Sequence, residues 1–241
     1  MKKSAVAVMF GLAAALSFAE PARTDDRSWR WSPVGIGISA PLQLPFIESD
    51  VYGLRIGGFF GYNNDVCGLD LGLAEVCAGD FRGAQVSAMS WTEGNAYGLQ
   101  LAPLANVVNG RSITLQVAFA NVDWDDAGGL QLGVVNYDAN YAGVQVGGLI
   151  NWNNANSYGL ELAVINANQD EFYGWSFGAL VNYSDKYRGC GIGLVNVAYE
   201  VTGLQLGLVN ACDRLHGVQF GLVNLICESK LPIMVLANAS F

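Results

Sequence analysis

Polar residues that could act together recur at one position of a sequence repeat, the third residue of each unit. We take as candidate lumen-lining residues Arg55, Asp70, Gln85, Gln100, Gln116, Gln131, Gln145, Glu161, Gln205 and Gln219, with Ser176 and Gly191 in the same column. A ring of such side chains could hold water and bias the passage of a solute. Glutamine carries both a donor and an acceptor, so neighbours could instead satisfy one another and fill the interior. The sequence leaves both interpretations open.

The remaining polar groups do not form a recognisable catalytic or metal-binding pattern. Asp123, Asp125 and Asp126 surround Trp124, but their spacing matches no EF-hand, and we predict solvated turn acids. His216 is the only histidine, and we predict a surface position for it. No G-x-S-x-G, HExxH or P-loop motif occurs. We therefore predict no enzyme activity, no catalytic residue, no metal and no cofactor.

The five cysteines leave their pairing undetermined. They are Cys67, Cys77, Cys190, Cys212 and Cys227, and none belongs to a CxxC pair, so a zinc site is poorly supported. An odd number in an oxidising compartment means that at least one thiol stays free or pairs outside the chain.

These side chains lie on a repeat that extends from about residue 52 to the end. Its clearest units are Gly203–Asn210 (GLQLGLVN) and Gly217–Asn224 (GVQFGLVN), and related units begin every 14 to 16 residues from Gly53 onward. Apolar residues alternate with Gly and Gln, which predicts β-strands with one apolar face. Short polar segments such as Asn153–Ser157 predict turns between the strands.

Two all-β architectures fit this pattern. The first is an antiparallel up-and-down transmembrane β-barrel of about fourteen strands, with leucines toward lipid and glutamines toward the lumen. Aromatic residues at both ends of the strands, for example Tyr158 and Trp152, and the terminal Phe241 favour it. The second is a parallel β-solenoid with one 14–16-residue repeat per coil, with leucines in the core and glutamines in an outer ladder.

The cysteines distinguish the two architectures. Cys212 and Cys227 follow successive strands. In a solenoid successive connections stack, so a disulfide between them is geometrically possible. In an up-and-down barrel they would lie on opposite rims. Four strands also carry an extra small residue (Gly57-Gly58, Ala102-Pro103, Gly147-Gly148 and Gly178-Ala179), which indicates either β-bulges or drift of the repeat.

The N-terminus predicts export. A basic start is followed by an uncharged apolar stretch from Ala5 to Phe18, which is typical of a signal peptide at residues 1–19. Residues 20–32 then form a polar arm, and residues 33–241 form the repeat domain. Loss of two lysines with the signal peptide moves the net charge from −9 to −11. So acidic a chain is not expected to bind nucleic acid.

The units at 203–210 and 217–224, and the ending LPIMVLANASF, resemble bacterial surface-repeat proteins, including spirochaetal surface-repeat proteins and repeat segments of Bacteroidetes envelope proteins. The resemblance covers residues 52–241 and implies a location in the cell envelope. Departures from the motif are Glu75 in place of Asn and Thr114 in place of Gly. The terminal Phe241 is similar to the ending of outer-membrane barrels, which implies the barrel-assembly machinery as a partner.

The leading hypothesis is therefore an outer-membrane barrel, in contact with outer-membrane lipid, with a structural or passive-transport role. The alternative is a secreted or cell-surface solenoid that binds a partner through its flat Gln/Gly face. The sequence names no solute or ligand for either.

Overall fold

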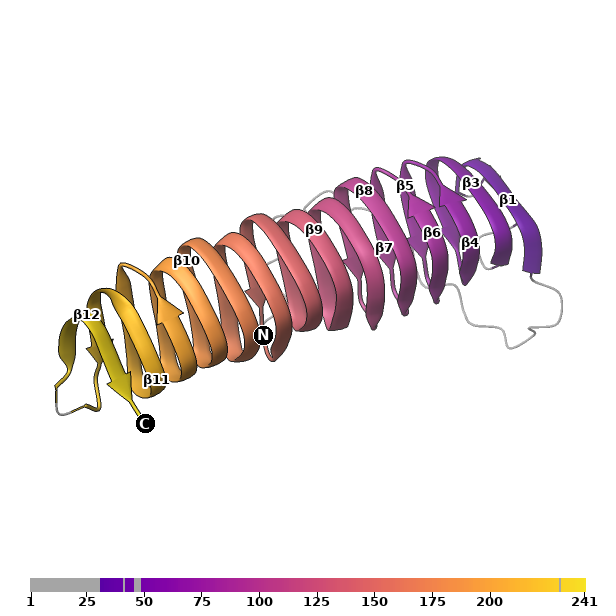
Figure 1. Cartoon of the computed structure of the whole chain (residues 1–241). Helices are drawn as coiled ribbons and strands as arrows, with labels where there is room; N and C mark the ends of the chain where they lie inside the picture. Colours follow the sequence, from indigo (N-terminus) through magenta and orange to yellow (C-terminus); the bar gives the residue numbers. More distant parts are fainter. Residues whose placement is uncertain (1–30, 41, 46–48, 230) are drawn as a thin grey trace, which may run out of the picture.

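The chain winds into a rod of stacked β-coils (Figure 1). The computed structural model describes residues 31–40, 42–45, 49–229 and 231–241, so the predicted signal peptide lies outside the described residues. Successive coils pair in parallel, which makes the architecture a parallel β-solenoid of about 12 turns. The prediction of an antiparallel barrel is therefore wrong, and the alternative, a solenoid, is confirmed. Period-two alternation is the same in both folds, and only the direction of strand pairing separates them.

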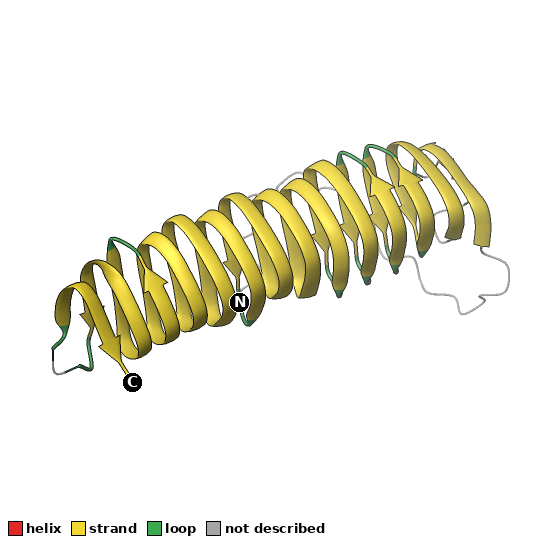
Figure 2. Ribbon diagram, in the orientation of Figure 1, coloured by secondary structure: helices red, strands yellow, loops and turns green. Residues whose placement is uncertain are grey.

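The strands in chain order are β1 (Trp31–Ser39), β2 (Leu42–Leu44), β3 (Asp50–Asn63), β4 (Val66–Leu71), β5 (Ala74–Cys77), β6 (Phe81–Val86), β7 (Met89–Thr92), β8 (Ala96–Val108), β9 (Ser112–Asn153), β10 (Ser157–Leu206), β11 (Val209–Ile226) and β12 (Ile233–Ser240). β1 begins at Trp31, inside the predicted polar arm. Figure 2 shows that β9 and β10 remain extended around corners, so each of them runs through several coils.

Each coil has two arms, which are separate strands in the N-terminal part of the rod. β4 is the first arm of one coil and β5 the second, with a corner at Gly72 and Leu73 between them. We number positions in a coil from the leading glycine of each repeat, so that Gly203 is position 1, Gln205 position 3 and Asn210 position 8. The extra small residue of four coils follows position 5 and is not numbered. Positions 13 and 14 are the two residues before the next leading glycine.

The coils stack in register, so like residues lie on like residues. Gly203 pairs with Gly217, Gln205 with Gln219, and Asn196 with Asn210. Each repeat position therefore forms a column along the rod at the strand spacing of about 4.8 Å. Where an extra small residue occurs the register shifts, as between Ala102 and Ala105, which confirms a bulge there.

The interior of the coil is largely polar, with a buried apolar column at position 13 that includes Phe81, Phe172 and Leu215, and the outer surface is apolar. Gln219 is 0% exposed and Asn210 is 0% exposed, whereas Leu208 is 49% exposed. The solenoid alternative placed the leucines in the core and the glutamines outside, and that orientation is wrong. A stacked amide donates to the coil on one side and accepts from the coil on the other, so amide columns satisfy their own hydrogen bonds inside a narrow coil.

Both ends of the stack are closed by antiparallel pairing. β2 folds back on β1, and β12 runs antiparallel to β11. β12 carries Phe241 just beyond its end, where the side chain is 95% exposed.

The glycine at position 1 is required by the stacking. Eleven glycines of this column have φ between 110° and 150°, a conformation that residues with a Cβ rarely adopt. A Cβ on Gly203 would also collide with the main-chain oxygen of Gly189 in the preceding coil. Glycine satisfies both constraints in eleven of the twelve coils from Gly53 to Gly217, and Thr114 takes position 1 in the remaining coil without a positive φ.

We predict that Gly203→Ala lowers the free energy of unfolding by roughly 1–3 kcal/mol because it adds backbone strain and a main-chain clash. The matched control is Gly148→Ala, where a Cβ would lie 3.5 Å from its nearest neighbour. The control should change stability by less than about 1 kcal/mol. Thermal and denaturant unfolding followed by circular dichroism measures both, and equal losses would contradict the proposed role of position 1.

Candidate functional site

All ten candidate residues of the third-position column point into the coil and are buried. From Gln85 to Gln145 they form a ladder in which each Nε2 donates to the side chain one coil earlier. These hydrogen bonds are Gln85–Asp70 at 2.7 Å, Gln100–Gln85 at 3.1 Å, Gln116–Gln100 at 3.1 Å, Gln131–Gln116 at 3.0 Å and Gln145–Gln131 at 2.9 Å. Gln219 and Gln205 repeat the contact at 2.9 Å. Along these stretches the column lies in the interior of the coils and hydrogen-bonds within itself.

The ladder is interrupted between Glu161 and Gln205. Ser176 and Gly191 take the column positions there, and the ring of Tyr187 occupies the space beside Gly191. Phe172 packs on Tyr187 with ring centroids 5.2 Å apart. This stretch of the interior is therefore held by aromatic packing.

A second ladder, which the sequence analysis did not single out, is formed by asparagine at position 8. Each Nδ2 donates to the Oδ1 one coil later at 2.8–3.0 Å. The residues are Asn106, Asn121, Asn136, Asn151, Asn166, Asn182, Asn196, Asn210 and Asn224. Most of them also donate to a main-chain carbonyl of the next coil, as Asn210 does to Phe220 at 2.8 Å. The recurrence of Asn at the end of each unit was the signal for this ladder.

Charged side chains replace the amides at the N-terminal end of both ladders. Arg55 forms two hydrogen bonds with Asp70, at 2.6 and 2.5 Å, and its Nη2 lies 3.0 Å from Glu75 Oε2. Burial raises the pKa of Glu75 to about 8, against the opposing effect of Arg55. A Cβ on Gly57 or Gly72 would collide with the Glu75 carboxylate, so these glycines make the space for it.

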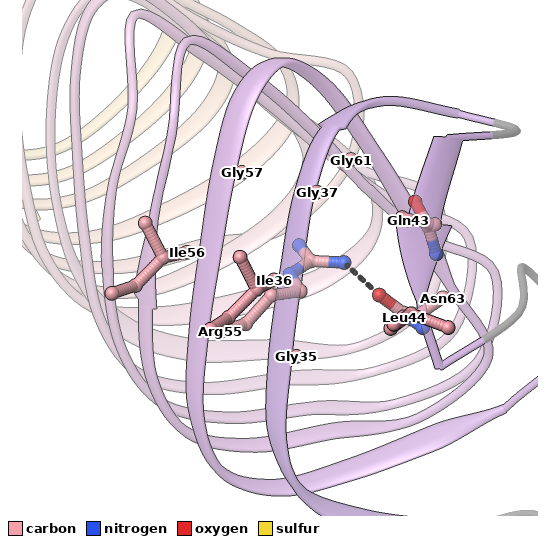
Figure 3. Close-up of a pocket in the computed structure, with 10 residues that line it drawn as sticks. All are labelled: Gly35, Ile36, Gly37, Gln43, Leu44, Arg55, Ile56, Gly57, Gly61 and Asn63. Carbon is pink, nitrogen blue, oxygen red and sulfur yellow. Dashed lines mark hydrogen bonds between the residues drawn. The ribbon is translucent and has the colours of Figure 1, made fainter.

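A small pocket opens beside this cluster (Figure 3). It is lined by Gly35, Gly37, Gln43, Arg55 and Asn63 among others, and the Arg55 guanidinium donates to Asn63 Oδ1 at 3.3 Å. Its volume of about 10 Å³ has room for about one water molecule. The pocket is too small for an organic substrate.

The structure divides the acidic cluster around Trp124. Asp123 points inward and is 0% exposed, whereas Asp125 and Asp126 are exposed as predicted. Gln116 and Gln131 donate to Asp123 at 3.1 and 2.8 Å. No group of three or more potential metal ligands occurs among the described residues. The inward carboxylate is held by amides.

Asp138 occupies the same inward position one coil later and is also 0% exposed. Gln131 donates to it at 2.7 Å, and Gln145 donates to its other oxygen. Burial raises the pKa of Asp123 to about 7, and burial together with the neighbouring Asp123 raises the pKa of Asp138 well above its usual range. Glu161, held by Asn153 and Asn168, has its pKa raised to about 7 by burial. The interior therefore favours the neutral form of all three acids.

The cysteines and the histidine form no site in the described coils. All five cysteines are free, so the disulfide that solenoid stacking allows between Cys212 and Cys227 is not formed. Their main chains are linked instead, by a hydrogen bond of 2.9 Å from Cys227 N to Cys212 O. His216 is exposed at position 14, as predicted.

The outer surface of the coils carries the largest unexplained feature. Positions 2, 4, 6, 7 and 9 point away from the interior, and from the coil of Gly53 to the coil of Gly217 each is Leu, Val, Ile, Ala, Met, Phe, Trp, Tyr or Cys. Some of the side chains at positions 7 and 9 are buried: Ala105, Val107, Val122 and Ala167 are 2–7% exposed. We call these five columns the outer apolar surface. Its most exposed column, the apolar ridge at position 6, contains Phe59, Leu73, Leu104, Phe119, Leu149, Leu180, Leu194, Leu208 and Leu222, which are 44–70% exposed.

The charges outside the interior are confined to one side of the rod. From residue 49 to residue 229 they all lie between positions 10 and 13, which we call the polar edge, or at position 14 beside it. Ion pairs join successive coils there, such as Arg214 to Glu200 at 2.6 Å and Lys186 to Glu171 at 3.2 Å. Tyrosines at position 14, including the stacked pair Tyr158 and Tyr173, border the outer apolar surface on one side. Within the surface, Trp91, Tyr137, Trp152 and Tyr183 at position 9 form its opposite margin.

Comparison with known proteins found no matching family model, no matching curated protein and no matching solved structure. Among the described residues there is no helix of the length and hydropathy needed to cross a membrane.

We predict that the free energy of unfolding decreases as the pH rises from about 4 to above 7. Asp123, Asp138 and Glu161 have raised pKa values in the folded chain, so the folded state binds more protons than the unfolded state in this window. Their contribution is complete below the unfolded pKa and is lost as the folded groups ionise. Denaturant unfolding at pH 4.5, 6 and 8 measures this loss.

The double variant Asp123→Asn/Asp138→Asn should reduce this pH dependence, and the contributions of Glu161 and Glu75 should remain. Asn153 and Asn168 occupy the same column in the next coils, so the amide fits the site. The control replaces the exposed Asp125 and Asp126 with asparagine and should leave the pH profile unchanged. A double Asp123→Asn/Asp138→Asn variant with the wild-type profile would contradict the assignment.

Proposed function

We propose that the chain is an exported, non-enzymatic β-solenoid of the bacterial cell envelope that acts as a binding module through its outer apolar surface. The observation that carries the proposal is the absence of any charged or amide side chain at five outward positions over twelve successive repeats. Monomeric soluble proteins rarely expose a continuous apolar surface of this extent, and such surfaces mark contact with a partner.

The interior supports a binding role at the surface. The glutamine and asparagine ladders use their own donors and acceptors on one another. The small pocket beside Arg55 holds about one water molecule. The flat Gln/Gly face of the earlier hypothesis is buried, so the binding surface moves to the leucine columns.

The predicted signal peptide and the resemblance to envelope repeat proteins support the location. The solenoid form supports the role, since stacked repeats present an extended and rigid surface. Half-exposed leucines on that surface each offer roughly 1 kcal/mol of apolar burial to a partner. Because these leucines recur along the rod, the total free energy of apolar burial available to a partner is large.

We predict that a ridge-serine variant, Leu104→Ser/Leu180→Ser/Leu222→Ser, leaves the envelope fraction of a Gram-negative host that expresses the full chain. The three leucines are 58%, 48% and 57% exposed, so their loss affects contacts with a partner more than it affects folding. At about 1 kcal/mol each, their removal weakens attachment by roughly a hundredfold. Immunoblots of envelope and soluble fractions measure the change.

The matched control carries three serines on the polar edge, at Asp125, Asp126 and Asp170. It should remain in the envelope fraction, and both variants should keep the wild-type circular dichroism spectrum. A ridge-serine variant that stays with the envelope, or a wild-type chain found in the soluble fraction, would overturn the proposal.

A further inference from the structure

The outer apolar surface is not flat but wraps around the rod. In the coil of Gly68, Leu69 and Leu71 face outward on β4, and Ala74 and Val76 face outward on β5, with Leu73 at the corner between the two strands. The same order is repeated in the neighbouring coils. The apolar zone is therefore convex and includes both arms of the coil and the corner between them.

A convex zone of this kind restricts what can cover it. A rigid partner, including a second copy of this chain, contacts one arm and leaves the other arm and the ridge in water. The ridge residues are among the most exposed apolar side chains, with Phe59 at 70% and Leu104 at 58%. A fluid apolar phase covers both arms and the corner together, and lipid acyl chains form such a phase.

The dimensions of the coil fit one leaflet of a bilayer. From position 14 to the corner at positions 5 and 6 the first arm advances about five residues, or about 16 Å. Half of the hydrocarbon core of a bilayer is about 15 Å thick. With the ridge at mid-bilayer, the tyrosines at position 14 fall at the level where hydrocarbon meets water, which tyrosine and tryptophan prefer. The aromatic residues at position 9 are three residues, or about 10 Å, from the ridge and lie just below that level.

The positions of the charges and the main-chain hydrogen bonds also fit a rod with its ridge at mid-bilayer. From residue 49 to residue 229 the outward charges lie on the polar edge or at position 14 beside it, away from the ridge, so the long axis lies parallel to the membrane plane. In-register pairing between coils satisfies the main-chain groups of the strands, as backbone in hydrocarbon requires. The net charge of −9 gives no attraction to anionic headgroups, so attachment depends on apolar burial.

We propose that the rod lies along one leaflet of a lipid bilayer, with its outer apolar surface in the acyl chains and its polar edge in water. This inference rests on the proposed function and names hydrocarbon as the partner. It makes the chain a protein that lies in the membrane and does not cross it.

The test uses purified full-length protein and vesicles of zwitterionic phosphatidylcholine, with single-tryptophan variants in which every other tryptophan is phenylalanine. The variants report three levels: Trp124 on the polar edge, Trp175 at position 2, and Phe119→Trp on the ridge. We expect the protein to float with the vesicles. Lipids brominated in the middle of the acyl chain should quench Phe119→Trp most, Trp175 less, and Trp124 at least threefold less than Phe119→Trp.

A second pair of probes tests the orientation along the rod. Phe59→Trp and Phe119→Trp lie on the ridge several coils apart and should be quenched equally if the rod lies flat. Aqueous acrylamide should give the opposite order of quenching for the three levels. Equal bromine quenching at all three levels, or unequal quenching along the ridge, overturns the placement.

The outcomes also separate this inference from the proposed function. If the ridge-serine variant leaves the envelope but the wild-type chain does not float, the binding role stands and hydrocarbon is not the partner. A monodisperse dimer in lipid-free sedimentation, with Trp175 shielded from acrylamide, would identify a second copy as the occupant. If the ridge-serine variant stays in the envelope, both proposals fail.

Discussion

The structure depends on the stacking of identical amide side chains at the spacing of parallel strands. Asparagine and glutamine carry a donor and an acceptor each, so a column of either satisfies itself when neighbouring coils are in register. A slip of one residue in any coil would turn these amides outward and leave buried partners without hydrogen bonds. Register, interior composition and coil geometry are therefore fixed by one repeated contact, seen most completely from Asn106 to Asn224.

The stacking of the coils also explains why glycine recurs in each repeat. At position 5, Gly207 lies beside the amides of Asn196 and Asn210, and a Cβ there would come within 2.7 and 3.0 Å of them. At position 1, the close approach of successive main chains leaves no room for a Cβ at glycines such as Gly203. The leucines then occupy the outward positions because the alternation of the strand leaves them no other place. An amide-filled coil thus produces an apolar exterior, the reverse of an ordinary globular domain.

The sequence predicted the strands, the repeat length and one of the two orientations of the side chains, but the leading hypothesis paired successive repeats antiparallel, whereas they pair in parallel. Alternation placed Leu204 and Leu206 opposite Gln205, and the barrel hypothesis correctly turned the glutamine inward. It failed on topology because alternation does not encode strand direction. The solenoid alternative predicted the correct topology. It predicted the wrong orientation of the side chains, since it followed the rule that leucines form the core.

The candidate site was likewise predicted only in part from the sequence. The third-position column was correctly grouped, because register brings like residues together in any stacked repeat. Glu75 and Asp138 were missed because they lie outside the third-position column, at positions 8 and 10. Asp123 was placed with Asp125 and Asp126 on the basis of proximity in sequence, whereas alternation puts it on the opposite face of the strand from its neighbour Trp124. A column-by-column alignment of the repeats separates these acids, because it compares residues that touch in space.

Because the amides lie inside and the leucines outside, the outer surface is the part of the fold that is available for binding. An interior filled by its own ladders has no free donor or acceptor column for a substrate, so recognition moves to the outer columns. The same in-register stacking that gives the amides their hydrogen bonds also aligns the position-6 side chains into one apolar ridge about 55 Å long. Because each coil adds the same increment of apolar area, attachment grows with the number of repeats and does not depend on any single residue. A smaller residue on the ridge, such as Ala88, then costs one increment of area and leaves the remaining surface intact.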